Sequence, residues 1–214
     1  MQPRAGTRAP ATPAAPKRRA EEILAAAAKV FAKRGYHGAA TQDIADVLGI
    51  RQASLYYYFA SKEAALEAVC ERGVEDYAAR ARAVERGEGS AAAKVEQLVI
   101  QHLAPLAERL DFTLVFLRER RFLPAPARAR IRAAERKYER IVQRVIARGI
   151  ASGEFRGDLN ARMATLALLG LGNSAAAWLG REPGASLGFI TRNYVELLVR
   201  AFRAGGPPLG ATRH

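Results

Sequence analysis

A chain of 214 residues, 50% hydrophobic and 26% charged, is long enough to bury a sizeable core in one large domain or in two fused smaller ones. Its single cysteine, Cys70, excludes an intrachain disulfide, and its three histidines show no metal-ligand spacing, so we expect no metal and no other cofactor. We find no apolar run long enough for a membrane-spanning helix and no apolar core of a secretory signal, and we therefore expect a cytoplasmic protein with no membrane partner.

The net charge of +13 is unevenly distributed along the chain. Residues 1–62 carry a net charge of +6, residues 63–108 carry −4, and residues 109–148 carry +8. Two basic blocks separated by an acidic one indicate either two anionic partners or one anionic partner and one solvated basic face.

The predicted elements are all helices, because Ala, Arg, Leu and Glu dominate and no segment alternates apolar and polar residues. Proline-rich residues 1–16 are expected to be a disordered arm, and residues 205–214 a flexible tail. Gly35 is expected to end the first helix, and Ser61 to cap a long fourth one. We predict an all-α protein of about nine helices, at 17–34, 41–48, 52–58, from 62 onward, 91–109, 111–120, 127–151, 159–179 and 186–203.

Residues 41–58 fit the steric pattern of a helix-turn-helix. Ile44 and Leu48 would be buried in the first helix, and Ala45 would lie at the helix crossing, where a larger side chain would force the helices apart. Gly49 falls at the turn, which requires a positive φ. Ile50, Leu55 and Tyr58 then supply the apolar side of the second helix. Residues 17–62 are therefore predicted to form a DNA-binding domain, and residues 63–204 a helical effector-binding and dimerisation domain.

Polar residues at the start of the second helix are suited to base edges in the major groove: Arg51, Gln52 and Ser54, with Ala53 between them. Thr41 and Lys62 lie at two other helix N-termini, where they could hold phosphates. Tyr56, Tyr57 and Tyr58 are consecutive, so helical geometry turns at least one of them outward, towards a phosphate. The alternative for the tyrosines is packing in the domain's core.

Residues 23–66 resemble the N-terminal domain of TetR-family transcriptional regulators, most specifically in the run Gly49-Ile-Arg-Gln-Ala-Ser-Leu-Tyr-Tyr-Tyr-Phe-Ala-Ser-Lys-Glu-Ala-Ala-Leu66. This resemblance implies a homodimeric repressor that binds a palindromic double-stranded DNA operator and leaves it when a small molecule enters the C-terminal domain. It also implies that the last two helices of each subunit form a four-helix bundle. Tyr58 departs from the family pattern, which often has His or another polar residue there.

Residues 168–178 are apolar nearly all round and contain several small residues, which favours close packing between subunits. The predicted dimerisation residues are Gly170, Ala176, Trp178, Tyr194 and Leu198. The alternative is a core helix within one chain.

In the second basic block, an apolar patch adjoins a cluster of arginines. This arrangement suits a ligand that has an apolar end and several anionic groups. The run Phe116-Leu-Arg-Glu-Arg-Arg-Phe-Leu123 resembles the TetR regulators that respond to acyl-CoA thioesters. Another apolar effector, or none, is the alternative, and Arg128 to Arg140 could equally be solvated surface. The predicted ligand residues are His102, Phe112, Phe116, Arg118, Arg121, Phe122, Tyr138 and Asn173. For His102 and Asn173 the alternative is a hydrogen bond inside the fold.

The alternatives to a ligand-responsive repressor belong to two other functional classes. A constitutive architectural DNA-binding protein would lack an effector. An enzyme acting on CoA esters is disfavoured, because we find no Ser-His-Asp grouping, no Gly-rich phosphate loop and no paired carboxylates, and we expect no catalytic residues. In the favoured mechanism, the ligand displaces the long fourth helix and so changes the spacing of the two recognition helices.

Overall fold

The computed structural model describes residues 16–205, and the arm and tail expected at 1–16 and 205–214 lie almost entirely outside that range. The described residues are helical almost throughout, which confirms the predicted all-α class. Within them, an isolated antiparallel bridge joins Phe155 to Arg203, and no helix is long and apolar enough to cross a membrane.

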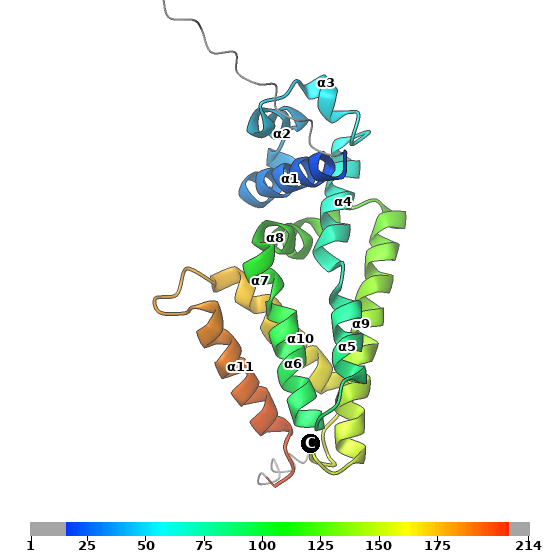
Figure 1. Ribbon diagram of the computed structural model, residues 1–214, viewed down its shortest axis with the longest axis vertical. Helices are drawn as coiled ribbons and strands as arrows, with labels where there is room; N and C mark the ends of the chain where they lie inside the picture. The colour runs from blue at the N-terminus through cyan, green and yellow to red at the C-terminus, as the bar shows by residue number, and fades with distance from the viewer. Residues whose placement is uncertain (1–15, 206–214) are drawn as a thin grey trace, which may run out of the picture.

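Three helices form the N-terminal end of the molecule (Figure 1): α1 (Pro16–Gly38), α2 (Thr41–Leu48) and α3 (Gln52–Leu55). Gly35, with φ 68° and ψ 167°, interrupts the helical path of α1 at the predicted position. Gly49 adopts the left-handed conformation expected for the turn, with φ 64° and ψ 34°. The second helix of the pair is shorter than predicted, because residues 56–58 form a turn instead of continuing it.

The predicted long fourth helix is wrong, because the chain forms two helices there, α4 (Lys62–Val74) and α5 (Tyr77–Arg86). Asp76 between them has a φ of +69°, outside the helical region. Arg109 donates a hydrogen bond of 2.7 Å to the carbonyl oxygen of Glu75, and thus holds the break from another part of the chain. The predicted cap is confirmed: the hydroxyl of Ser61 accepts a hydrogen bond of 3.1 Å from the backbone N–H of Ala64.

The remaining helices form the larger, lower part of the molecule (Figure 1). The segment expected at 91–109 is divided at Pro105, because proline starts a new helix more readily than it continues one. The elements are α6 (Ala91–Leu103), α7 (Pro105–Glu108), α8 (Leu110–Glu119), a 3-10 turn η1 (Arg120–Phe122), α9 (Ala125–Ala151), α10 (Ala161–Trp178) and α11 (Leu187–Phe202).

Two apolar cores hold these helices together. One contains Phe31, Ile44 and Leu66 from the N-terminal end, and it also takes Val115 from α8 and Ile131 from α9. The other joins α5, α6, α9, α10 and α11. Because α8 and the first turns of α9 share a core with α1 and α4, a movement of α8 is transmitted directly to the N-terminal helices.

Candidate nucleic-acid interface and effector cavity

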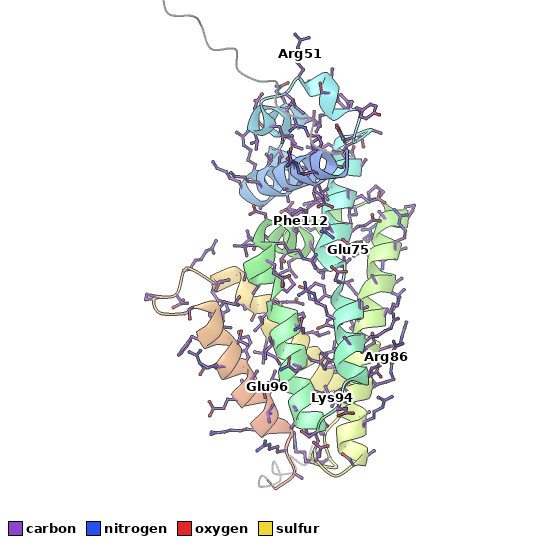
Figure 2. The ribbon with its side chains drawn as sticks, viewed as in Figure 1. Arg51, Glu75, Arg86, Lys94, Glu96 and Phe112 are labelled. Carbon is purple, nitrogen blue, oxygen red and sulfur yellow. The ribbon has the colours of Figure 1, made fainter. Side chains whose placement is uncertain are left out.

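The helix pair α2–α3 is held by buried side chains and exposes its polar ones. Ile44, Ala45 and Leu55 are buried between the two helices, as the steric pattern predicts. Arg51, Ala53 and Ser54 are exposed at the start of α3. Figure 2 shows Arg51 projecting from the end of the molecule, away from the other helices. No other described part of the chain covers this edge, so it is free to meet a partner.

Hydrogen bonds within a small polar cluster hold the side chains at this edge in place. The side-chain amide of Gln52 donates a hydrogen bond of 2.6 Å to the hydroxyl of Thr41, which lies 3.4 Å from the hydroxyl of Tyr56. Tyr57 is 87% exposed, and Tyr56 and Tyr58 are also exposed. The alternative in which all three tyrosines pack in the core is therefore wrong.

Lys62 connects α4 to the junction of α1 and α2. Its ammonium group donates a hydrogen bond of 2.9 Å to the carbonyl oxygen of Ala39 and lies 4.5 Å from the centre of the Tyr36 ring. The Tyr36 hydroxyl donates a 2.6 Å hydrogen bond to Glu63. Burial and this neighbouring carboxylate raise the pKa of Tyr36 to about 12. In this structure Lys62 has structural partners, and a phosphate contact from it stays a prediction.

The same junction receives a contact from α8. The backbone N–H of Tyr36 donates a hydrogen bond of 2.9 Å to the carboxylate of Glu119, which lies against the turn at Gly35. The Phe122 ring stacks on Tyr36 with centroids 5.7 Å apart and meets His37 edge-on at 4.4 Å. The end of α8 and the following turn η1 therefore pack against the end of α1 and hydrogen-bond to it.

A cavity of about 250 Å³ lies between α4, α5, α6, α8, α9 and α10. Its most enclosed wall contains buried side chains such as His102, Phe116 and Tyr138, whereas Gly170 and Asn173 of α10 are exposed at its opening. The lining residues are Val74, Tyr77, His102, Thr113, Phe116, Leu117, Arg120, Ala134, Glu135, Tyr138, Glu139, Leu166, Leu169, Gly170 and Asn173.

Four of the predicted ligand residues line this cavity, namely His102, Phe116, Tyr138 and Asn173. The other four lie outside its lining: Phe122 is in the junction with α1, Arg121 lies over its ring, Phe112 packs against the N-terminal core, and Arg118 is exposed. Arg120, which was not predicted, does line the cavity. Arg120 follows Thr113, Phe116 and Leu117 at helical spacing, but the sequence alone does not show which face of α8 turns towards the cavity.

His102 is both hydrogen-bonded inside the fold and exposed to the cavity. Its Nδ1 atom lies 3.1 Å from the hydroxyl oxygen of Tyr138, and the two rings stack with centroids 5.8 Å apart. Burial lowers the pKa of His102 to about 4, against the smaller opposing effect of hydrogen bonds to Leu169 and Asn173. The imidazole is therefore neutral at pH 7. Asn173 is an exposed residue, so its side chain is not enclosed within an apolar helix.

Two glycines of α10 offer a matched test of this packing. A Cβ atom at Gly172 would overlap the His102 ring, whereas one at Gly170 would have no neighbour within 4 Å. We expect Gly172→Ala to lower the free energy of unfolding by about 1–3 kcal/mol through overpacking. Gly170→Ala should raise it by up to about 1 kcal/mol, because alanine favours helix. Urea unfolding of both variants measures the difference, and equal stabilities would contradict the close contact between α6 and α10.

The charged side chains at the cavity are largely paired. Arg120 lies 3.1 Å from Glu135, and its guanidinium lies 4.7 Å from the centre of the Phe116 ring. Glu139 pairs with Arg162 of α10 at 2.7 Å. Burial raises the pKa of Glu135 above its usual range. The charged lining residues Arg120, Glu135 and Glu139 are thus half-buried and paired, whereas the buried lining residues carry no charge.

The basic residues of α9 fall into two groups. One group pairs with carboxylates of α4 and α5, as in the contact of Arg144 with Glu85 at 2.8 Å. The other group is exposed and makes no ion pair with any residue in the described range. We call this second group the outer basic face; it comprises Arg128, Arg132, Arg136, Lys137 and Arg140. A role of this face in binding ligand phosphates stays a prediction.

Large apolar side chains are exposed on both α10 and α11. Met163 and Leu166 of α10 and Phe189 and Leu197 of α11 are between 39% and 57% exposed. We call these four residues the exposed apolar face. Of the predicted dimerisation residues, Gly170 is exposed, and Trp178 and Tyr194 are half-buried and pack edge-on at 6.3 Å. Ala176 and Leu198 are buried in the core of their own chain, and thus are already covered without a partner.

Two family models match this chain. Residues 23–69 match the bacterial regulatory proteins of the tetR family, and residues 88–202 match the tetracyclin repressor-like C-terminal domain. The second match alone covers more than half of the chain. The chain therefore belongs to the tetR family of transcriptional regulators, which are not enzymes.

Individual relatives agree with this assignment. The chain is 48% identical over 61 residues to the transcriptional repressor KstR2 of Mycolicibacterium smegmatis, a match that covers 28% of this chain and 30% of that relative's length. A tetR-family regulatory protein from Rhodococcus RHA1 has the same fold, with a TM-score of 0.80 and 26% identity over 87% of this chain and 98% of the other. The regulator FadR of Bacillus subtilis, solved in complex with stearoyl-CoA, superposes with a TM-score of 0.69 at 24% identity, over 86% and 99% of the two chains.

Proposed function

We propose that the protein is a homodimeric, ligand-responsive repressor that binds a palindromic DNA operator and leaves it when a small molecule enters the cavity. The observation that carries this proposal is the α2–α3 pair, whose packing is buried while Arg51, Gln52 and Ser54 remain accessible at one edge. Such an edge fits the major groove, where arginine and amide side chains discriminate base pairs. With DNA as its partner, the proposed site of action is the cytoplasm.

The effector in this proposal is an acyl-CoA thioester or another apolar molecule. Phe116, Leu117 and Leu169 give the cavity an apolar wall that suits an acyl chain. The outer basic face lies on the same helix as Glu135 and Tyr138 of the cavity and supplies unpaired arginines for phosphate groups. FadR of Bacillus subtilis, a neighbour in fold, binds stearoyl-CoA. The cavity also favours this function over that of a constitutive architectural DNA-binding protein.

The proposed function is tested by effector-dependent release of DNA. Duplexes bound by the full chain are first selected from a random pool, and binding is then measured by fluorescence anisotropy with octanoyl-CoA, free CoA or octanoate. We expect octanoyl-CoA to weaken DNA binding at least about tenfold, which is within the usual range for coupling between an effector site and a DNA site. Free CoA and octanoate should have little effect on DNA binding. Unchanged DNA binding in the presence of acyl-CoA thioesters of every chain length would contradict the proposed effector class.

Gln52 is expected to read a base. Its amide is held 2.6 Å from the hydroxyl of Thr41 at the exposed edge of α3, and is thus positioned before DNA arrives. Gln52→Ala should change the preferred base at one position of each half-site, where a good contact is worth about 1–3 kcal/mol, and should change binding to other sequences far less. Gln97→Ala, the same change at an exposed position of α6, is the control. A uniform loss of affinity for all duplexes would show that Gln52 reads no base.

A further inference from the structure

The most enclosed wall of the cavity contains a polar pair, His102 and Tyr138. Both side chains are buried, and their Nδ1 and hydroxyl oxygen atoms are 3.1 Å apart. Around them the wall is formed by apolar and aromatic side chains, including Tyr77, Phe116 and Leu169. Polar groups placed in an otherwise apolar pocket orient a ligand and select its chemistry, because a ligand without the matching group leaves them unpartnered.

The partners of His102 determine which hydrogen-bonding position is left for a ligand. The Nε2 edge of the ring lies against α10 at Gly172, and hydrogen bonding to Leu169 and Asn173 of the same helix opposes the fall in the pKa of His102. We assign the ring proton to Nε2, which faces these two residues, so that Nδ1 carries a lone pair and accepts the proton of the Tyr138 hydroxyl. The Tyr138 oxygen then has no proton left to donate, but it retains a lone pair. No other group of the described residues hydrogen-bonds to that oxygen.

Charge excludes an ionic group from this wall. Burial lowers the pKa of His102 to about 4 and raises that of Tyr138 above its usual range, so both are neutral at pH 7. The nearest charged lining residues, Arg120 and Glu135, form an ion pair with each other. A carboxylate or ammonium group at the enclosed wall would therefore lack a counter-charge and be costly to bury.

We propose that the effector carries a neutral hydroxyl group on its apolar portion, and that this hydroxyl donates a hydrogen bond to the oxygen of Tyr138. A ketone has no proton to donate, and an unsubstituted chain leaves the lone pair unpartnered. The inference rests on the proposed function in that it takes this cavity as the effector site. It does not require the effector to be a CoA thioester.

The test compares matched ligands on the full chain by isothermal titration calorimetry. The probes are unsubstituted acyl-CoA thioesters of six, eight and ten carbons, the same thioesters with a terminal hydroxyl or a ketone at the next-to-last carbon, and the methyl esters of all these acids. At the chain length that reaches the pair, we expect the hydroxylated probe to bind about 2- to 12-fold tighter than the unsubstituted one, the size of one neutral hydrogen bond.

Two variants assign the effect to the right group. Tyr138→Phe keeps the ring and should abolish the preference for the hydroxyl, and thermal unfolding establishes that it is folded. Tyr77→Phe removes a hydroxyl from the same cavity and should keep the preference. The proposal is overturned if unsubstituted or keto probes bind as tightly as hydroxylated ones at every length, if Tyr138→Phe keeps the preference, or if no hydroxylated probe binds.

These results also separate the inference from the proposed function. Preference for hydroxylated methyl esters, without binding of any CoA thioester, would support the hydroxyl site and contradict the CoA effector. Release of DNA by octanoyl-CoA, with no preference for a hydroxyl at any length, would support the effector and contradict the hydroxyl site.

Discussion

Replacing Phe189 and Leu197 by aspartate is expected to convert the protein to a monomer and to weaken operator binding by about a hundredfold or more. In the single chain, the side chain of Phe189 is 50% exposed and that of Leu197 is 56% exposed. Both belong to the exposed apolar face, together with Met163 and Leu166. Large apolar side chains exposed on two neighbouring helices are typical of a dimer surface. Charges buried in such an interface are costly, and a monomer contacts only one half-site.

The change in charge alone would also weaken binding to DNA, so the control must carry the same charge. Ala79→Asp with Ala133→Asp adds two carboxylates at exposed positions of α5 and α9, away from α10 and α11. We expect this control to remain a dimer in sedimentation velocity and to lose far less operator affinity than the Phe189/Leu197 variant. A dimer of normal operator affinity in the Phe189/Leu197 variant would place the interface elsewhere.

Replacing Glu119 by alanine is expected to separate effector binding from DNA release. Its carboxylate accepts a 2.9 Å hydrogen bond from the backbone N–H of Tyr36, while the next residue, Arg120, lines the cavity and pairs with Glu135. A ligand that moves Arg120 therefore moves the group that holds the end of α1. In Glu119→Ala the effector should still bind, but the tenfold release of DNA should fall to about threefold or less.

The variant should also lose about 1–3 kcal/mol of stability, because the N–H of Tyr36 loses a charged acceptor. Glu119→Gln retains an acceptor oxygen and should restore most of the response, which a general loss of stability would not explain. Asp111→Ala removes another carboxylate of α8, one with no side-chain hydrogen bond or ion pair in the described range, and should respond normally. An unaltered response of Glu119→Ala to the effector would exclude this route of coupling.

The helix-turn-helix was predictable because its determinants are local. Gly49 must adopt a positive φ, and Ile44, Ala45 and Leu55 must be small or apolar within a few residues of it, so the pattern is visible in the sequence alone. The break between α4 and α5 was not predictable. It depends on Arg109, which is 34 residues from Glu75 and reaches its carbonyl only in the folded chain.

The lining of the cavity was predictable only in part, because it too depends on contacts between distant parts of the chain. His102, Phe116, Tyr138 and Asn173 were predicted, because polar or aromatic residues on apolar helices are unusual. Of the arginines in this part of the chain, Arg120 lines the cavity. Which arginine reaches the cavity depends on the rotation of α8 about its axis. That rotation is set by packing against α1 and α4, which sequence periodicity over a ten-residue helix does not determine.

The central claim, that two α2–α3 pairs of a dimer read duplex DNA, is tested most directly by the DNA that the protein selects from a random pool and by the stoichiometry of the complex. The account predicts an inverted repeat whose half-sites are about 34–36 Å apart, or a multiple of that spacing, bound by two chains or a multiple of two. The preference should be lost in the double variant Arg51→Ala, Gln52→Ala. Recovery of no repeated motif, or a motif bound equally well by that double variant, would contradict it.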